Sequence, residues 1–287
     1  MIMYIKQRRN ANIISRMLNM YKIEKNEDKN FMYIPIKESS STKKIEKVCK
    51  KANKYLYDNN IKDIILENTL MENEVAKNEF YSNNLNILEG TKLSKIITYN
   101  IIHKIYEYKN KKLEESEITF LINENDDINI QIITMIAKET RRINMITKNI
   151  KKFENFIKYM YIEYGIIIKL SSNIKTNLKG TELLVNMDFP EEIINKLYIP
   201  NNITILNIPK DIEIKAKRFS GINIKSWEIE VPKKYDLEDF KKEILYEAYI
   251  YKKPIKEAFE QVKKDRIKIK NLKGKNGIIS FKEFRKF

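Results

Sequence analysis

The chain has 287 residues, of which 43% are hydrophobic and 33% charged, so it can bury a core and does not have the composition of a disordered protein. Its single cysteine and single histidine exclude an internal disulfide and an ordinary zinc site. No apolar run has the length of a membrane span or a signal peptide, which predicts a cytoplasmic protein.

The net charge of +16 is concentrated at the two ends of the chain. Residues 1–60 carry +8, residues 61–208 carry −1 and residues 209–287 carry +9. Lys, Ile and Asn account for 130 residues, and all three have A/T-rich codons. The excess of lysine therefore does not by itself indicate a nucleic-acid partner.

The first 88 residues predict a small α/β segment. Residues 1–20 mix Met, Ile and Arg and favour a short amphipathic helix. Residues 31–36 predict a strand, and the serines before residue 42 are N-cap candidates for a helix to about residue 57, with apolar positions at the helical period. A second strand follows at residues 61–66.

Residues 89–208 predict a Rossmann-like domain. After a long helix at 91–108, apolar strands alternate with helices of about three turns. Strands are expected at 118–122, 143–147, 166–170, 182–187 and 203–207, and helices at 128–140, 150–164 and 191–196. Such alternation indicates a parallel sheet with right-handed crossovers.

Residues 209–287 predict a β-ribbon followed by a basic helical C-terminal extension. Apolar and polar residues alternate over 210–231, and helices are expected at 235–251 and 255–265, separated at Pro254. The fold class predicted for the whole chain is α/β.

The first strand-to-helix turn of the central domain lacks the glycines that normally let backbone N–H groups approach a pyrophosphate. The turn Asn123–Asn129 contains no glycine and three carboxylates, those of Glu124, Asp126 and Asp127. A pyrophosphate at ~5 Å would meet like charges, each pair costing on the order of 1–3 kcal/mol. The turn therefore disfavours ordinary NAD(P) binding, and the acids are interpreted as helix caps.

Three segments resemble the shikimate-dehydrogenase-like branch of the amino-acid-dehydrogenase superfamily. They are Gly90-Thr91 before the long helix, Thr147–Asn149 with Lys152, and the run from Glu182 to Pro190 (ELLVNMDFP). The resemblance implies an α/β dehydrogenase fold and, as an alternative function, an NADP-dependent oxidoreductase whose Lys148 and Lys152 receive the 2′-phosphate. In that case the cofactor-binding residues would be Asn123, Lys148, Asn149, Lys152, Asn186 and Asp188.

The departures from this family concern catalysis. Lys92 stands where the resemblance places a catalytic Asp, the substrate-binding Ser-x-Ser motif has no counterpart, and the catalytic Lys cannot be placed among 47 lysines. No catalytic residue is assigned. The leading hypothesis is a catalytically degenerate protein without a cofactor that acts through binding or regulation, with an unidentified protein partner.

Other chemically active residues have ordinary structural interpretations. Asp126 and Asp127 with Asp188 are a candidate cation site, but capping is favoured. His103 is expected at the surface or its boundary, and Cys49 is expected to pack against an apolar stripe.

The basic run near the C-terminus leaves two interpretations open. It contains Lys263, Lys264, Arg266, Lys268 and Lys270. A solvated lysine face is favoured, and binding to nucleic acid or an anionic surface is the second alternative.

Overall fold

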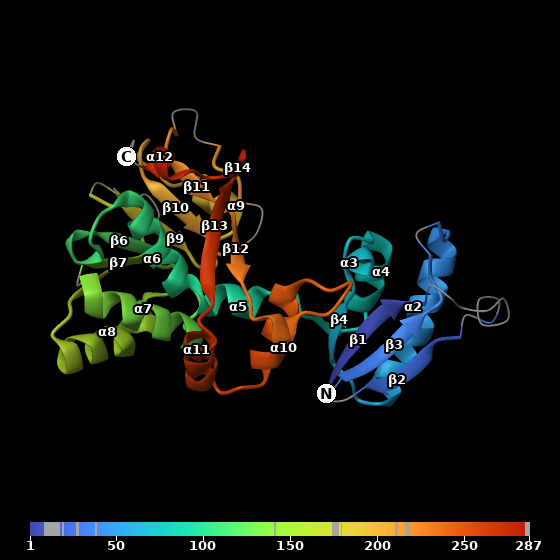
Figure 1. Ribbon diagram of the computed structural model, residues 1–287. Helices are drawn as coiled ribbons and strands as arrows, with labels where there is room; N and C mark the ends of the chain where they lie inside the picture. Colours follow the sequence, from blue (N-terminus) through green and yellow to red (C-terminus); the bar gives the residue numbers. More distant parts are fainter. Residues whose placement is uncertain are drawn as a thin grey trace. The chain divides into compact units, whose positions relative to one another are not determined.

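The computed structural model describes residues 1–8, 18, 20–26, 29–37, 39–140, 142–173, 178, 180–209, 212–215 and 219–284. The chain forms two compact units (Figure 1). The first contains Met1–Leu93 and Val231–Lys252, and the second contains Ser94–Glu230 and Lys253–Phe287. This division differs from the predicted boundaries at 88 and 208, because a C-terminal segment folds with the N-terminal one.

The first unit contains a five-stranded sheet in the order β2-β3-β1-β4-β5. Its strands are β1 (Ile2–Gln7), β2 (Lys22–Asn26), β3 (Lys29–Ile34), β4 (Asp63–Leu66) and β5 (Asn86–Ile87). Only β2 runs antiparallel to its neighbour. The helix predicted for the first 20 residues is wrong over 2–7, which form β1 between two strands. Residues 9–17 and 19 lie outside the described residues.

Alternating side chains of this sheet enter two cores. Met3 and Ile5 face the core closed by α2 (Thr42–Asp58) and α4 (Glu74–Tyr81), which follows the short α3 (Asn68–Met71). Tyr4 faces the core closed by α10 (Lys242–Tyr251), which follows the short η2 (Lys233–Tyr235). The C-terminal helix α10 therefore covers the second face of the N-terminal sheet.

The second unit contains a six-stranded parallel sheet in the order β11-β10-β9-β6-β7-β8. Its strands are β6 (Ile118–Leu121), β7 (Ile143–Ile146), β8 (Ile168–Ser171), β9 (Leu183–Asn186), β10 (Thr204–Asn207) and β11 (Ile222–Ile224). Numbered along the chain within this sheet, the order is that of the Rossmann fold, 3-2-1-4-5-6. The predicted α/β class with a Rossmann-like parallel sheet is confirmed.

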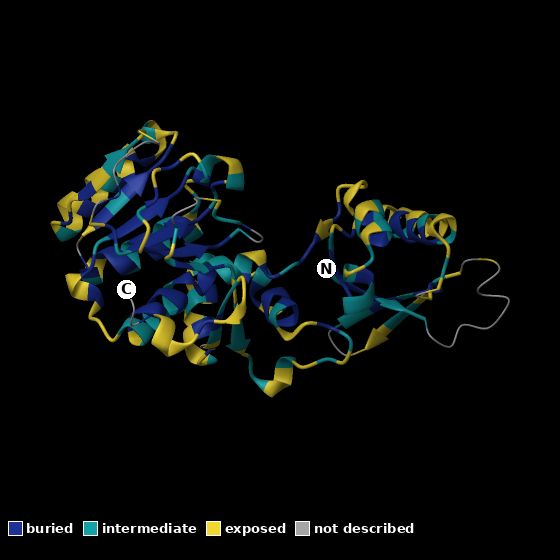
Figure 2. Ribbon diagram, turned by 90° about the horizontal axis from the view of Figure 1, so that it is seen from above, coloured by how far each residue is buried: buried dark blue, intermediate teal, exposed yellow. Residues whose placement is uncertain are grey.

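Helices on both faces of this sheet leave its inner strands β6, β9 and β10 buried, as the dark blue arrows in Figure 2 show. The predicted helix at 91–108 is two helices, α5 (Thr91–Ile96) and α6 (Thr98–Lys109), because the backbone leaves helical geometry at Ile97. The remaining elements are η1 (Leu113–Glu115), α7 (Asp127–Thr140), α8 (Ile150–Tyr164), α9 (Glu191–Ile194), α11 (Ile255–Lys264) and α12 (Phe281–Phe284).

The C-terminal extension is not wholly helical. A small antiparallel sheet pairs β12 (Ser226–Glu230) with β13 (Lys268–Gly274), and β13 with β14 (Gly277–Ile278). The predicted ribbon is thus found at 226–230, whereas 222–224 belong to the parallel sheet. Part of the basic run lies in β13, where Ile269 and Leu272 are buried.

Candidate functional site

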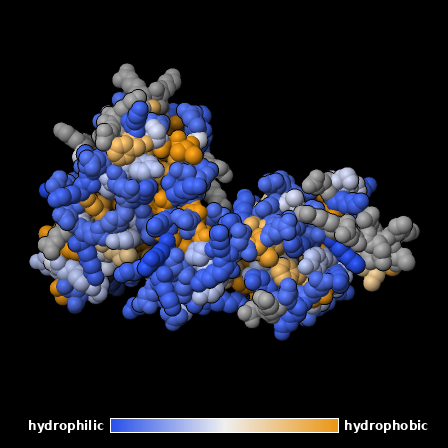
Figure 3. All heavy atoms as spheres, viewed as in Figure 1, coloured by the Kyte–Doolittle hydropathy of each residue, from blue (hydrophilic) through white to orange (hydrophobic). Residues whose placement is uncertain are grey.

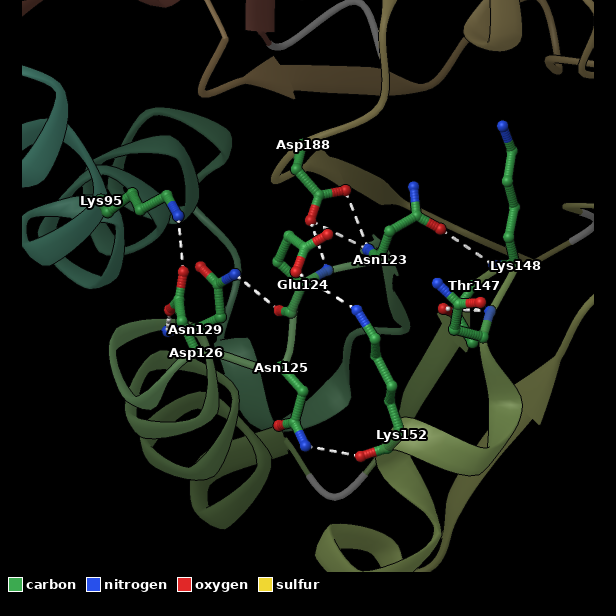
Figure 4. Close-up of polar contacts among 11 residues, drawn as sticks. Lys95, Asn123, Glu124, Asn125, Asp126, Asn129, Thr147, Lys148, Lys152 and Asp188 are labelled. Atoms are coloured by element: carbon green, nitrogen blue, oxygen red, sulfur yellow. Dashed lines mark hydrogen bonds and ion pairs between the residues drawn. The ribbon is translucent and has the colours of Figure 1, made fainter. Parts of the chain in front are cut away.

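The candidate site lies at the carboxyl ends of β6 and β9, where the strand order of the sheet reverses. Ligands of open α/β sheets bind at such switch points. Asn123 and Glu124 follow β6, and Asp188 follows β9. Both carboxylate oxygens of Asp188 accept the backbone N–H of Asn123 at 2.9 Å, and one accepts that of Glu124 at 2.8 Å (Figure 4).

This arrangement gives the N–H donors of the first turn an acceptor within the protein. In a dinucleotide-binding domain these donors approach the pyrophosphate. Here the carboxylate of Asp188 takes the place of an anionic ligand. Burial raises the pKa of Asp188 above its ordinary value, although the two backbone N–H groups act in the opposite direction. A second anion at this position would therefore displace or face a partly buried carboxylate.

The loop after β7 contacts the same turn through the backbone of Lys148 rather than through the Lys148 side chain. The N–H of Lys148 donates to Oδ1 of Asn123 at 2.9 Å. The Lys148 side chain points away from the cluster (Figure 4). The N–H of Asn149 donates to Oγ1 of Thr147 at 3.1 Å, immediately before α8. Asn123, Lys148 and Asp188 are thus brought together, but the ammonium group of Lys148 is not directed into the site.

Asp126 caps the following helix, and the Asp126 and Glu124 carboxylates each pair with a lysine. Asp126 accepts the N–H of Asn129 at 2.7 Å in the first turn of α7, and its other oxygen lies 2.7 Å from Nζ of Lys95. Nζ of Lys152 lies 3.4 Å from Oε2 of Glu124. Lys95 and Lys152 are therefore already paired with carboxylates of the turn.

Asn186, the last predicted site residue, lies within a row of three asparagines on neighbouring strands, of which Asn186 and Asn207 are buried and Asn223 is partly buried. Its side-chain amide donates to Oδ1 of Asn207 at 3.1 Å, and that of Asn207 donates to Oδ1 of Asn223 at 2.7 Å. Asn186 also exchanges two hydrogen bonds with the backbone of Phe189. Sequence analysis missed Asn207 and Asn223, although each follows or lies within a short apolar strand.

Lys92, which replaces the catalytic Asp implied by the resemblance, has a structural role in the first unit. Its Nζ donates to the carbonyl of Tyr251 at 2.5 Å, at the end of α10, and lies 5.4 Å from the Tyr251 ring centroid. Partial burial lowers the pKa of Lys92. Glu247 of α10 accepts the N–H of Leu93 at 3.4 Å. These two hydrogen bonds hold α10 against the start of α5.

The other candidate residues are spread over the chain. His103 lies 3.1 Å from a carboxylate oxygen of Glu139, which also accepts the Tyr99 hydroxyl at 2.6 Å. Cys49 is fully buried, and burial raises the pKa of its thiol to about 12, so it is a packing residue. Among the described residues, no group of three or more His, Cys, Asp or Glu side chains has a metal-binding arrangement.

The five cationic residues of the C-terminal run are all exposed at the end of α11 and along β13. They are Lys263, Lys264, Arg266, Lys268 and Lys270. In the described part of the chain, no helix combines the length and apolar character needed to cross a bilayer.

No family model and none of the curated proteins matches this sequence. Solved structures superpose only partly. L-alanine dehydrogenase is 10% identical with a TM-score of 0.31, over 50% of this chain, which spans about half (49%) of that protein. L-tryptophan dehydrogenase from Nostoc punctiforme is 8% identical with a TM-score of 0.39, over 91% of this chain and 78% of the other. Ornithine transcarbamoylase from Giardia lamblia is 6% identical with a TM-score of 0.31, over 77% and 75%. Likenesses this low say nothing about the activity of this chain.

Proposed function

We propose that this protein is a catalytically degenerate member of the Rossmann-fold proteins, which acts through binding or regulation of an unidentified protein partner rather than through hydride transfer. The observation that carries the proposal is the contact of Asp188 with the N–H groups of Asn123 and Glu124. These donors are the feature of the fold on which pyrophosphate binding depends.

A dinucleotide does not fit the residues at this turn. The pyrophosphate would have to displace the Asp188 carboxylate, and the charge of Glu124 would remain beside it. Side chains replace the glycines that allow close backbone approach. The Lys152 ammonium, which the resemblance assigns to the 2′-phosphate, is 3.4 Å from Glu124. Loss of dinucleotide binding removes the hydride carrier and with it the reaction of the family.

The alternative function, an NADP-dependent oxidoreductase with an atypical phosphate site, requires Asp188 to leave its three hydrogen bonds and Lys152 to leave Glu124. Lys148 and Lys152 would then be the phosphate-binding cations. This alternative makes a clear prediction, because replacing Lys148 by Glu would abolish NADP binding while leaving NAD binding intact.

Calorimetry with NAD, NADH, NADP and NADPH on purified, nucleotide-free protein tests the proposal. We expect no heat of binding at about 1 mM nucleotide, which corresponds to a binding free energy weaker than about −4 kcal/mol. The variant Asp188→Asn keeps the shape of the side chain and removes its charge, and it serves as the matched comparison. Micromolar binding by the wild-type protein, lost in Lys148→Glu, would refute the proposal in favour of the alternative.

A second candidate function is binding to a polyanion through the C-terminal run. The favouring observation is that all five of its cations are exposed on adjoining elements, α11 and β13. Point variants are the better test of polyanion binding. Deleting the chain after Pro254 would also remove the buried residues of β13, whereas point variants change only the charge. The variant Lys263→Gln/Lys264→Gln/Lys268→Gln lowers the charge by three and leaves Ile267, Ile269 and Leu272 in place.

A further inference from the structure

Helix α2 carries a row of lysines along its outer face. Lys43, Lys47, Lys50 and Lys54 recur at the helical period, so they lie in one stripe, and all four are exposed. Within the described residues none of the four takes part in an ion pair. No carboxylate in the described part of the chain therefore forms an ion pair with these four ammonium groups.

The high lysine content of the whole chain does not by itself explain the charge of α2. Hydrophilic side chains cover most of the face shown in Figure 3, so the number of lysines alone carries little weight. Their distribution is more informative. With six lysines and two acidic residues, α2 has a net charge of +4 over 17 residues, whereas α8 has +1 over 15 and α11 has +1 over 10. A compositional bias would have acted on all three helices alike.

The same stripe ends in an exposed aromatic ring. Tyr57 follows Lys50 by seven residues and Lys54 by three, and it is 82% exposed. From Lys43 to Tyr57 the stripe is about 21 Å long. The lysines border a shallow surface hollow of about 410 Å³, whose lining also includes Glu46 and Lys51. An extended anionic chain could lie along this hollow with one of its bases on the ring.

We infer that the outer face of α2 binds single-stranded nucleic acid. Proteins that bind single strands without sequence preference combine a cationic track for the phosphates with aromatic rings on which bases stack. A lipid surface fits less well, because stable attachment needs an apolar face to insert. The apolar face of α2, with Ile45, Val48 and Leu56, is buried against its own sheet. This inference is independent of whether the Rossmann-like unit binds a nucleotide.

Fluorescence anisotropy with labelled oligothymidylate and oligouridylate of about 20 nucleotides tests the inference on the full chain. Four phosphate contacts predict a slope of about −3 for log Kobs against log salt concentration. In the variant Lys47→Gln/Lys50→Gln/Lys54→Gln the slope should fall to about −0.7, and binding at about 0.1 M salt should weaken about 100-fold. Tyr57→Ala should weaken binding about tenfold and leave the slope unchanged.

The variant Lys112→Gln/Lys158→Gln/Lys196→Gln is the matched control, because it removes the same charge from exposed lysines that belong neither to α2 nor to the C-terminal run. It should bind as the wild-type protein does. Equal loss in this control and in the α2 variant, or loss in the C-terminal variant Lys263→Gln/Lys264→Gln/Lys268→Gln alone, would overturn the inference. So would binding of the wild-type protein to phosphatidylserine vesicles but not to either oligonucleotide. Circular dichroism of each variant shows that the fold is retained.

Discussion

Lys109, at the end of α6, is a lysine held largely out of water. Its Nζ donates to the carbonyl oxygen of Glu182 at 3.0 Å and lies 5.6 Å from the ring centroid of Tyr106. Burial lowers the pKa of Lys109 to about 8, and the positive charge of Lys111 acts in the same direction, whereas Glu182 opposes the shift. The folded protein therefore loses this proton at a lower pH than the unfolded chain does.

The lowered pKa predicts that stability increases with pH above about 8. Between the folded pKa of about 8 and the unfolded value of 10.5, the unfolded state binds more protons, so the free energy of unfolding rises. From pH 7 to about 9.5 the gain from Lys109 is on the order of 2 kcal/mol. Urea unfolding across this pH range measures the gain.

The variant Lys109→Met keeps the aliphatic stem and removes the titrating group, so it is the control for this pH dependence. We expect the difference in unfolding free energy between wild type and variant to change by about 2 kcal/mol over the same pH range. A difference that stays constant with pH would show that Lys109 is not the source.

Single residues also show where sequence analysis of the site reached its limit. The absence of glycine and the excess of carboxylates at Asn123–Asn129 predicted caps, and Asp126 is one. The role of Asp188 was not predicted, because it depends on β9 lying beside β6 and on a contact between residues 65 positions apart. Lys148 and Lys152 were identified by position alone, and position does not reveal that one points away and the other pairs with Glu124.

At the scale of elements, the local pattern of apolar residues predicted most of the strands and helices of the Rossmann-like unit. The strands at 118–121, 143–146, 183–186 and 204–207 and the helices α7 and α8 agree with prediction to within about two residues. Buried parallel strands are continuous apolar runs, and these are distinct in sequence. The strands β2, β5 and β14 were missed because short or edge strands are half-exposed and set by their partners.

Helix α10 illustrates an element whose position is fixed by contacts that its own sequence does not show. Its end is capped by the Lys92 ammonium on the carbonyl of Tyr251, and Glu247 binds the N–H of Leu93. A cation beside the C-terminal carbonyls of a helix stabilises it, and an anion there destabilises it. The residue that the resemblance would require at position 92 is therefore unfavourable here.

We predict that Lys92→Asp loosens α10 without abolishing the fold. Losing the cap and placing a carboxylate near Glu247 should cost about 1–2 kcal/mol. Amide hydrogen exchange over 242–251 should accelerate about 5- to 30-fold. Lys92→Met retains the apolar stem and should show a smaller increase. Unchanged exchange in Lys92→Asp would contradict a capping role for Lys92.

At the scale of the whole molecule, the two units are each built from chain segments that are distant in sequence. Residues 231–252 belong to the first unit, although the segments before and after them belong to the second. Their side chains share with the N-terminal sheet a core that contains Phe240, Ile244, Leu245, Tyr4, Phe31 and Ile65. No linker composition marks this return, which is why sequence analysis placed all residues after 208 in one extension. The core of the N-terminal unit is complete only once residues near position 245 have been made.

Because the two units have separate cores, we predict that a cavity introduced into one unit destabilises mainly that unit. Leu245 belongs to the core between α10 and the N-terminal sheet, and Ile205 lies in the core of the parallel sheet. Leu245→Ala and Ile205→Ala should each cost about 2–5 kcal/mol. In hydrogen exchange read by mass spectrometry, Leu245→Ala should deprotect residues 1–93, and Ile205→Ala should deprotect residues 118–207. Because Leu245 lies 152 residues after Leu93, deprotection of the N-terminal segment by a change so late in the chain is a specific test of this architecture. Equal deprotection of both units by either variant would mean that the two cores unfold as one.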